Sequence, residues 1–224
     1  MTDVAVRSGE KPGSAPAHPL DPATAAEYLE GREIMAAAGL LARPVRFAYY
    51  GLEEPPKDEV LAGTGAARDR RLRAFLIDTS TGASADVVVS LGERRVVSEY
   101  QLDTAADGQL PIIDAEYGLV EELVRADPDW RAAMARRGLT DMAGLRICPI
   151  TAGSFGPPED DRRRMVRVLA FRQASEHDLA WAHPVDGVTA YVDLIEKTVF
   201  RVVNEFELPV PAESGDYDDP AVRG

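Results

Sequence analysis

Hydrophobic and polar residues along this chain follow two similar cycles, and the first cycle begins with a helical pattern. Asp21-Pro22 predicts the helix start, because Asp can cap the first free amides and Pro at the next position loses no hydrogen bond. Gly39 predicts the helix end. The apolar residues at helical spacing are Ala25, Tyr28, Leu29, Met35 and Ala36. Segments rich in β-branched and aromatic residues then predict four strands, at 45–52, 71–79, 83–91 and 94–102, with a long loop over 53–69.

The second cycle repeats this order from Asp114 onward. Its apolar stripe at i, i+3, i+6 and i+7 predicts a helix and comprises Tyr117, Val120, Leu123 and Val124. Asp127-Pro128 breaks that helix and predicts a short second one, in which Trp130 and Met134 share a face. Four further strands are predicted at 145–150, 165–173, 187–195 and 198–208.

The last strands of the two cycles resemble each other in sequence. VVSEYQL at 96–102 aligns with VVNEFEL at 202–208, an offset of 106 residues. A helix followed by four antiparallel strands needs only short connections and buries one sheet face against the helix. The sequence therefore predicts an α+β protein of two tandem domains, at residues 20–105 and 106–208. A disordered leader at 1–19 and a linker at 209–224 flank them.

Composition and charge narrow the possible partners. The chain has 224 residues and a formal net charge of −13, which argues against nucleic acid and against anionic membranes. The arginine clusters at 68–71 and 162–164 lie beside acidic residues and are interpreted as solvated strand entries. The longest apolar run, IMAAAGLLA, is too short to cross a bilayer, and the N-terminus lacks a signal-peptide pattern. With the single cysteine, Cys148, interpreted as a buried thiol, these features predict a reduced, cytoplasmic protein.

Candidate chemistry is sparse. The three histidines, His18, His177 and His183, lack the close spacing of metal ligands. His183 precedes Pro184 and a β-turn, so we expect it at a strand end with its ring bonded to a backbone carbonyl. No second polar group is evident near it, which favours a structural role over a general base. Sequence patterns for a nucleophile elbow, a phosphate loop and a dinucleotide fold are also absent.

Several short motifs together resemble a known family. They are His18-Pro19-Leu20, TAGSFG at 151–156, RMVR at 164–167, AWAHPVDG at 180–187, Val192-Asp193, Pro209-Val210-Pro211 and Gly215-Asp216-Tyr217. In this order they resemble the N-terminal region of copper-containing primary-amine oxidases. The resemblance implies two tandem cystatin-like domains, called N2 and N3, each a helix packed on an antiparallel sheet. That expectation agrees with the duplication inferred from spacing.

The resemblance also implies where the catalytic chemistry resides. In the family, a larger β-sandwich domain carries an Asn-Tyr-Asp/Glu motif, whose tyrosine becomes topaquinone, and a His-x-His pair that binds copper. Here the only asparagine, Asn204, precedes Glu205, and no His-x-His occurs. We therefore expect no catalytic, cofactor-binding or metal-binding residue in this chain and no activity in isolation. The implied full-length enzyme is a homodimer with copper and topaquinone, and the linker leads toward its catalytic domain.

Four residues match positions that line the amine channel in the family, namely Tyr117, Pro149, Ile150 and Trp181. Tyr117 fits the apolar helix stripe equally well. Trp181 is the better candidate, because a tryptophan at a loop-to-strand boundary is rarely buried completely. Ile150 stands where the family often has Leu.

These observations lead to one main hypothesis and two alternatives. The chain is expected to be the accessory region of an enzyme that converts a primary amine, O2 and water to an aldehyde, ammonia and H2O2. A stand-alone cystatin-like interaction module without catalysis is the first alternative. A small-molecule enzyme that uses a cavity between helix and sheet is the second, and it lacks a convergent set of polar residues.

Overall fold

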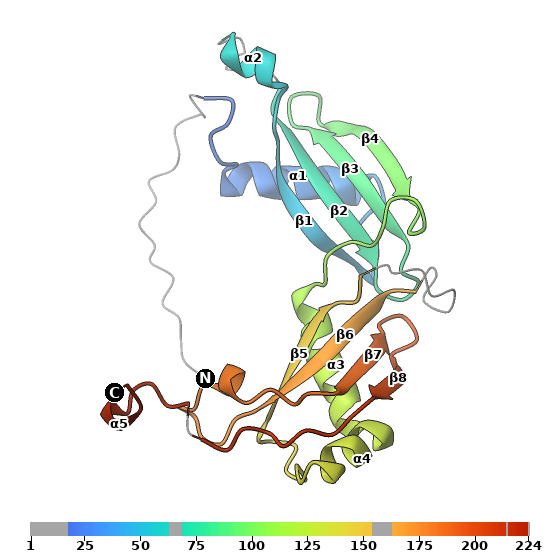
Figure 1. The fold of residues 1–224 in the computed structure, drawn as a ribbon. Coiled ribbons are helices and arrows are strands. Elements are labelled where there is room, and N and C mark those ends of the chain that lie inside the picture. The colour runs from blue at the N-terminus through green and yellow to red at the C-terminus, as the bar shows by residue number, and fades with distance from the viewer. Residues whose placement is uncertain (1–17, 63–68, 154–162, 214, 224) are drawn as a thin grey trace. The chain divides into compact units, whose positions relative to one another are not determined.

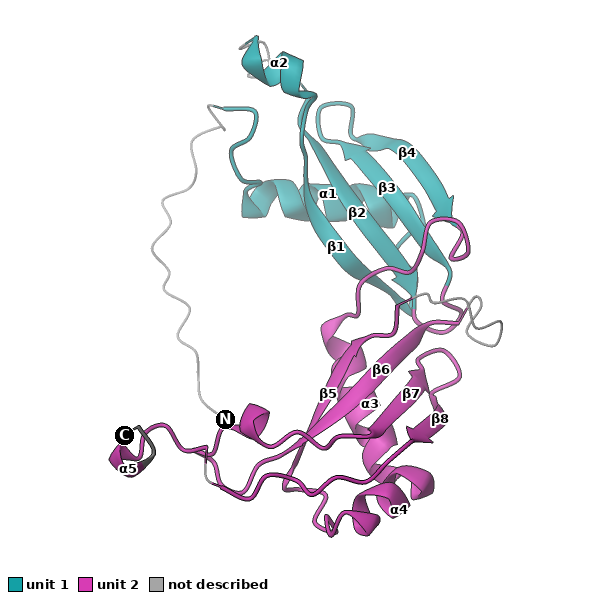
Figure 2. Cartoon of the chain, viewed as in Figure 1, with its two compact units in different colours: residues 1–78, 83–102 teal, residues 79–82, 103–224 magenta. Residues whose placement is uncertain are grey.

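The computed structural model describes residues 18–62, 69–153, 163–213 and 215–223. The chain divides into two compact units, coloured separately in Figure 2. The first comprises the residues up to Asp78 together with Ala83–Leu102, and the second comprises Thr79–Gly82 together with the residues from Asp103 onward. The predicted disordered leader, residues 1–19, lies outside the described residues except for His18 and Pro19.

The first unit is a four-stranded antiparallel sheet with a helix across one face (Figure 1). Its strands follow chain order in the sheet, β1-β2-β3-β4. The elements are α1 (Ala25–Ala37), β1 (Val45–Glu53), α2 (Lys57–Leu61), β2 (Arg71–Asp78), β3 (Ser84–Ser90) and β4 (Arg95–Leu102).

A capping box fixes the start of helix α1. The N-cap is Thr24, three residues after Asp21, so the start predicted from Asp21-Pro22 is wrong. The Glu27 amide donates to Thr24 Oγ1 at 3.3 Å, and the Thr24 amide donates to Glu27 Oε2 at 2.8 Å. Asp21 instead accepts a hydrogen bond from the His18 amide at 2.8 Å. These contacts place the first turn of the helix beyond the proline.

The other end and the buried face of α1 are only partly as predicted. Gly39, with a φ of 79°, follows the C-cap, which confirms the predicted helix end. The buried residues of the helix are Gly31, Ile34 and Met35. Leu29 is 62% exposed, so its predicted place in the apolar stripe is wrong.

The predicted loop over 53–69 contains α2, a short helix that begins after Pro56. Proline is compatible with a helix start because the first amides have no partner within the helix. The loop prediction is therefore wrong for 57–61, and residues 63–68 lie outside the described part of the chain. The core between α1 and the sheet consists of Ile34, Met35, Leu72, Ala74, Leu76, Ala85, Val87 and Val89.

The second unit repeats this architecture, with a second helix directly after the first. Its sheet order is β5-β6-β7-β8, again antiparallel throughout, and α3 lies behind the sheet in Figure 1. The elements are α3 (Asp114–Ala126), α4 (Pro128–Arg136), β5 (Leu145–Thr151), β6 (Met165–Arg172), the 3-10 helix η3 (Ala180–Ala182), β7 (Val188–Asp193), β8 (Thr198–Asn204) and α5 (Pro220–Arg223). The predicted fold class, two tandem α+β domains, is confirmed.

Helix α4 starts where the sequence predicts. Asp127 caps it by accepting a hydrogen bond from the Trp130 amide at 2.8 Å, and Pro128 occupies the first turn. Trp130 and Met134 are both fully buried, in a core shared with Val120, Val124, Val168 and Ala190. The strand predicted over 198–208 is wrong for its last four residues, because β8 ends at Asn204, opposite the first residue of β7.

The two sheets end in equivalent hairpins. Ser90 pairs with Arg95 in one and Asp193 with Thr198 in the other, and the residue before each second strand has positive φ, 51° at Arg94 and 54° at Lys197. These positions differ by 103 residues, so the predicted offset of 106 is wrong by three. Turn geometry sets the strand register, and the similarity of VVSEYQL to VVNEFEL does not.

Candidate functional site

A buried arginine ties the start of α3 to β6. Arg164 Nε and Nη2 donate to the two carboxylate oxygens of Glu116, each at 2.6 Å. Its Nη1 and Nη2 also donate to the carbonyls of Leu110 and Pro111, both at 2.8 Å. Glu116 in turn accepts the Ile113 amide at 2.9 Å. Both side chains are almost fully buried, so the expectation of a solvated strand entry is wrong for Arg164.

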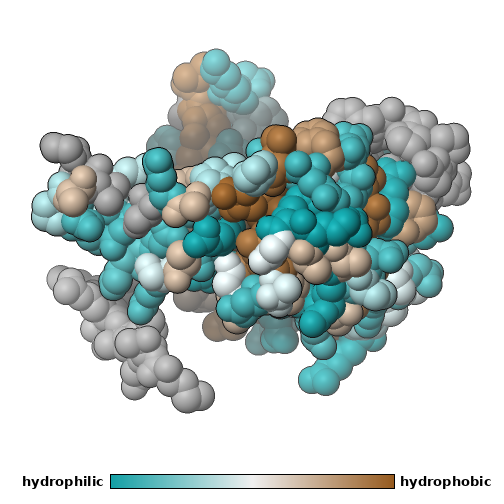
Figure 3. Space-filling model, turned by 60° about the horizontal axis from the view of Figure 1, so that its bottom comes forward, coloured by the Kyte–Doolittle hydropathy of each residue, from teal (hydrophilic) through white to brown (hydrophobic). Residues whose placement is uncertain are grey.

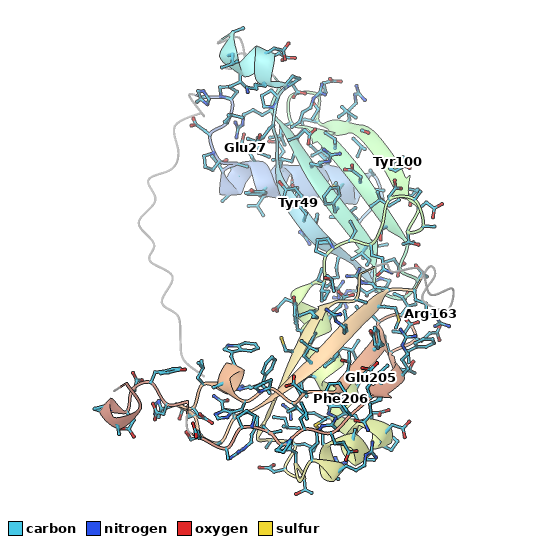
Figure 4. All side chains as sticks on the ribbon, in the orientation of Figure 1. Glu27, Tyr49, Tyr100, Arg163, Glu205 and Phe206 are labelled. Carbon is cyan, nitrogen blue, oxygen red and sulfur yellow. The ribbon has the colours of Figure 1, made fainter. Side chains whose placement is uncertain are left out.

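The first unit contains the same arrangement in a more exposed form. Arg70 Nε donates to Glu27 at 2.5 Å, and its Nη2 donates to the Asp21 carbonyl at 3.0 Å. Burial alone would raise the pKa of Glu27, but hydrogen bonds from Arg70 and Thr24 outweigh it and hold that pKa below its usual value. Figure 4 labels Glu27 at α1. Both arginines precede the second strand of their sheet, so the ion pair is part of the duplicated unit.

His183 lies at the centre of a second buried polar cluster. Its Nδ1 lies 2.8 Å from the Pro211 carbonyl oxygen, and its Nε2 lies 2.9 Å from Asp178 Oδ1. The Pro211 carbonyl oxygen can only accept a hydrogen bond, so in that contact Nδ1 is the donor. The predicted bond to a backbone carbonyl is confirmed. The prediction that no second polar group lies nearby is wrong, because Asp178 is there.

Asp178 holds this cluster together. It accepts the Ala174 amide at 2.9 Å and the Gly215 amide at 2.8 Å in addition to His183. These hydrogen bonds, the one from Ala174 first, outweigh the effect of burial and lower the pKa of Asp178 to about 2. The Leu179 amide also donates to the Gly215 carbonyl at 3.2 Å. Gly215 is therefore fastened to the loop that precedes η3, and Pro211 is fastened to His183, which follows η3.

This cluster is suited to positioning the chain rather than to catalysis. Both ring nitrogens of His183 already have partners, and the side chain is 3% exposed, so it offers no free nitrogen to a metal or substrate. Across the described ranges, no group of three His, Cys, Asp or Glu side chains is placed to hold a metal ion. Copper has no fitting ligand set there, and we assign no step to it in this chain.

The four residues expected to line a channel all belong to the second unit, but they lie at different places in it. Tyr117 is on α3 and 43% exposed, and Trp181 is in η3 and 59% exposed. Pro149 and Ile150 are neighbours on β5, opposite Val168 and Arg167 of β6. Since side chains alternate along a strand, Pro149 points to the helix-covered face, as Val168 does, and Ile150 to the other.

Trp181 shares the open sheet face with Ile150 at some distance. Its ring packs edge-on against Phe171, with centroids 4.5 Å apart. Phe171 pairs with Arg146, four residues along β5 from Ile150, or about 13 Å at strand spacing. The four residues thus do not converge on one pocket within this unit. Trp181 is one of several exposed apolar side chains in the unit, together with Leu179, Phe206, Leu208 and Tyr217. Figure 3 shows apolar residues among hydrophilic ones on the side it brings forward.

Other sequence expectations fare differently. Cys148 is a free thiol on β5 and is only partly buried, so its interpretation as a buried thiol is only partly correct. The Arg164–Glu116 and His183–Asp178 pairs were not found by sequence reasoning. The sequence did contain a signal for Glu27, the partner of Arg70 in the first unit, because Thr24-x-x-Glu27 is a capping-box pattern.

Of the described helices, none combines the length and apolar character needed to cross a membrane.

Comparison with known proteins decides the family. Residues 24–99 match the AGAO-like N2 domain, and residues 115–219 match the copper amine oxidase N3 domain. The chain belongs to the copper amine oxidase family. This confirms the resemblance inferred from the motifs.

Similar amine oxidases are longer than this chain. It is 43% identical to a histamine oxidase of Arthrobacter globiformis over 94% of this chain and 31% of that protein. It is 33% identical to a copper methylamine oxidase of Arthrobacter sp. (strain P1) over 89% of this chain and 30% of that protein. The chain therefore spans about a third of the length of these curated relatives.

A solved structure shares the fold. The copper-containing benzylamine oxidase from Hansenula polymorpha aligns with a TM-score of 0.69 and 16% identity, over 92% of this chain and 34% of that one. At this identity the similarity shows the fold alone. The two tandem units are thus the arrangement found in an N-terminal part of copper amine oxidases.

Proposed function

We propose that this chain is the N-terminal accessory region of a copper- and topaquinone-dependent primary-amine oxidase. The enzyme would convert a primary amine, O2 and water to an aldehyde, ammonia and H2O2. One observation carries the proposal: N2 and N3 domains follow each other and account for most of a chain that spans about a third of its relatives. The oxidoreductase chemistry would then belong to a catalytic domain outside these residues.

The distribution of ligand types supports this division of labour. Copper in proteins is bound by imidazole and similar ligands that converge on one point, and the described residues offer no such group. The sequence contains no Asn-Tyr-Asp/Glu motif, because Asn204 is its only asparagine. Copper and topaquinone would therefore be held by the catalytic domain of a cytoplasmic homodimer, and the isolated chain would be inactive.

Within that enzyme, the second unit would contribute to the wall of the amine channel. Tyr117, Pro149, Ile150 and Trp181 are the proposed contributors, and the exposure of Trp181 supports it most strongly. Because they do not form a pocket by themselves, the catalytic domain would supply the opposite wall. Residues 209–224 would lead to that domain, with the His183–Asp178 cluster fixing the direction in which they leave the second unit.

The reading frame beyond the codon for Gly224 tests this proposal directly. We expect it to encode Asn-Tyr-Asp/Glu and His-x-His, and the complete product with copper to release H2O2 from a primary amine. The 224-residue chain, treated identically, should release none. Unrelated downstream sequence would contradict the proposal. Peroxide production by the 224-residue chain alone would show that its catalytic residues had been missed.

A further inference from the structure

The open face of the second sheet has an arginine whose partner is missing from the described residues. Arg167 lies on β6, opposite Ile150 on β5 and Tyr191 on β7. Its neighbours Val166 and Val168 point into the core, so Arg167 points to the face that α3 leaves open. Its Nε is buried and has no hydrogen-bond partner among the described residues. Such an atom is unusual, because burying an unpaired donor of a charged group is unfavourable.

The first unit shows what this position binds when its partners are present. Arg73 is three residues after Arg70, as Arg167 is three after Arg164, and each is on the second strand of its sheet. Arg73 Nε donates to Asp86 Oδ1 at 2.8 Å, and its Nη2 donates to Asp86 Oδ2 at 2.5 Å. Its Nη1 donates to Glu53 at 3.4 Å. The equivalent of Arg167 thus holds two carboxylates.

Both carboxylates are replaced in the second unit. Ser90 and Asp193 occupy equivalent positions at the two hairpins. Asp86 lies four residues before Ser90, and Thr189 lies four residues before Asp193. Glu53 pairs with Arg71. The β5–β6 register ends at Thr151 opposite Val166, and the residue that follows β5, which would stand opposite Met165, is Ala152. Neither Thr189 nor Ala152 can neutralise a guanidinium group. The duplicated unit has kept the arginine without its acidic partners.

The surroundings of Arg167 have the character of an interface core. Leu169, Phe171, Tyr191 and Val203 lie on the same open face and are only partly buried. Arg201 stacks over Tyr191, with its Cζ 4.2 Å from the ring centroid. Arginine and aromatic residues such as Phe171 and Tyr191 are enriched among the residues that form protein interfaces and dominate their binding energy.

We infer that the open face of the second sheet docks on the catalytic domain, and that Arg167 there binds an Asp or Glu side chain of that domain. The inference rests on the proposed function, since it takes the catalytic domain as the occupant. A carboxylate fits because it accepts two parallel hydrogen bonds from guanidinium, as Asp86 does from Arg73. Docking would also cover the surrounding apolar side chains.

Arginine labelling with phenylglyoxal, read by mass spectrometry, tests this in two proteins. These are the 224-residue chain and the complete polypeptide that includes the catalytic domain. Arg167 should react at least about tenfold more slowly in the complete polypeptide, and exposed Arg32 on α1 should react equally in both. Equal labelling of Arg167 would overturn the inference. If Arg167 of the 224-residue chain is protected from labelling only at high protein concentration, the open face binds a second copy of the chain. That result would also overturn the inference.

The variant Arg167→Met separates docking from a role in folding, with Arg32→Met as the matched control. We expect Arg167→Met to leave the melting temperature of the 224-residue chain unchanged or higher, and to lower that of the complete polypeptide. Equal destabilisation of both would mean that Arg167 acts within its own unit, which refutes the inference. Amine oxidation by the wild-type complete polypeptide is scored separately. If it is active while Arg167 labels equally in both proteins, only the docking inference fails. If no catalytic domain accompanies this chain, both proposals fail.

Discussion

Replacing Arg164 by methionine should strongly destabilise the second unit. Methionine keeps an unbranched apolar side chain but removes the guanidinium group and its four hydrogen bonds to Glu116, Leu110 and Pro111. The Glu116 side chain, only 7% exposed, would remain as a buried charge without a counterion. Removing one member of such a buried pair destabilises a protein by about 3–5 kcal/mol.

The first unit supplies a matched comparison in Arg70→Met. This variant removes the equivalent guanidinium, but the Arg70 and Glu27 side chains are 17% and 15% exposed, so water can partly replace the lost contacts. We expect a loss of about 2 kcal/mol, the level of hydrogen bonds to charged groups. The difference between the two variants measures the effect of burial on one interaction in two copies of the same fold.

Tryptophan fluorescence during urea unfolding can follow the second unit selectively. Both tryptophans of the sequence, Trp130 and Trp181, belong to that unit, and Trp130 is fully buried. With a urea slope of about 2 kcal/mol per molar, a loss of about 4 kcal/mol moves the midpoint by about 2 M. Far-ultraviolet circular dichroism reports on both units and serves for Arg70→Met.

Two outcomes would refute this reasoning. A midpoint shift below about 0.5 M for Arg164→Met, equivalent to about 1 kcal/mol, would show that the pair contributes no more than an exposed one. The double variant Arg164→Met/Glu116→Leu should be more stable than Arg164→Met alone, because it removes the uncompensated charge. Additive loss in the double variant would contradict the assignment of the penalty to Glu116.

Three further predictions address other parts of the second unit. The pKa of Asp178, about 2 against an ordinary 3.8, means that its stabilising effect is complete above about pH 4 and is lost as the pH falls toward 2. Asp178→Asn should therefore lower the free energy of unfolding at pH 7 by about 2 kcal/mol. In urea titrations at decreasing pH, the stability difference between this variant and the wild type should become smaller. A difference that stays constant with pH would be inconsistent with this prediction. Gly187→Ala should destabilise the unit more than Gly138→Ala in the same urea assay. The two glycines have nearly the same φ, 74° and 75°, but only at Gly187 would an added Cβ lie 2.1 Å from the Phe206 carbonyl oxygen. Equal destabilisation by the two variants would count against this prediction. In the complete enzyme, Trp181→Ala should change KM for bulky amines more than for small ones, and an unchanged amine profile would remove Trp181 from the channel.

Strand positions could be predicted from the sequence because alternation and turn residues are local signals. The error at 205–208 has a physical origin, since Phe206 and Leu208 continue the apolar alternation yet are 50% and 49% exposed. Strand β8 stops opposite the first residue of its antiparallel partner β7, and the extent of that partner is not encoded in the pattern of one strand. The helix start failed for a different reason: Asp21-Pro22 and Thr24-x-x-Glu27 are both start signals, and only the second forms a reciprocal pair of hydrogen bonds.

The polar clusters could not be predicted because their members are brought together only by the fold. His183 and Pro211 are 28 residues apart, and Arg164 and Glu116 are 48 apart. Neither pair has a characteristic spacing. The resemblance to amine oxidases located the channel candidates by matching positions, but it gave no side-chain direction, and the alternation along β5 places Pro149 and Ile150 on opposite faces.

The two units show which interactions a duplicated fold needs and which it can change. Both keep an arginine before the second strand that binds the glutamate at the start of the helix, and both keep the same hairpin register. They differ on the open sheet face, where Arg73 has acidic partners and Arg167 Nε has none among the described residues. The helix-to-sheet tie maintains each fold, so a change there would destabilise the unit. The open face contributes little to the core, and its arginine can therefore be left for a partner from outside the unit.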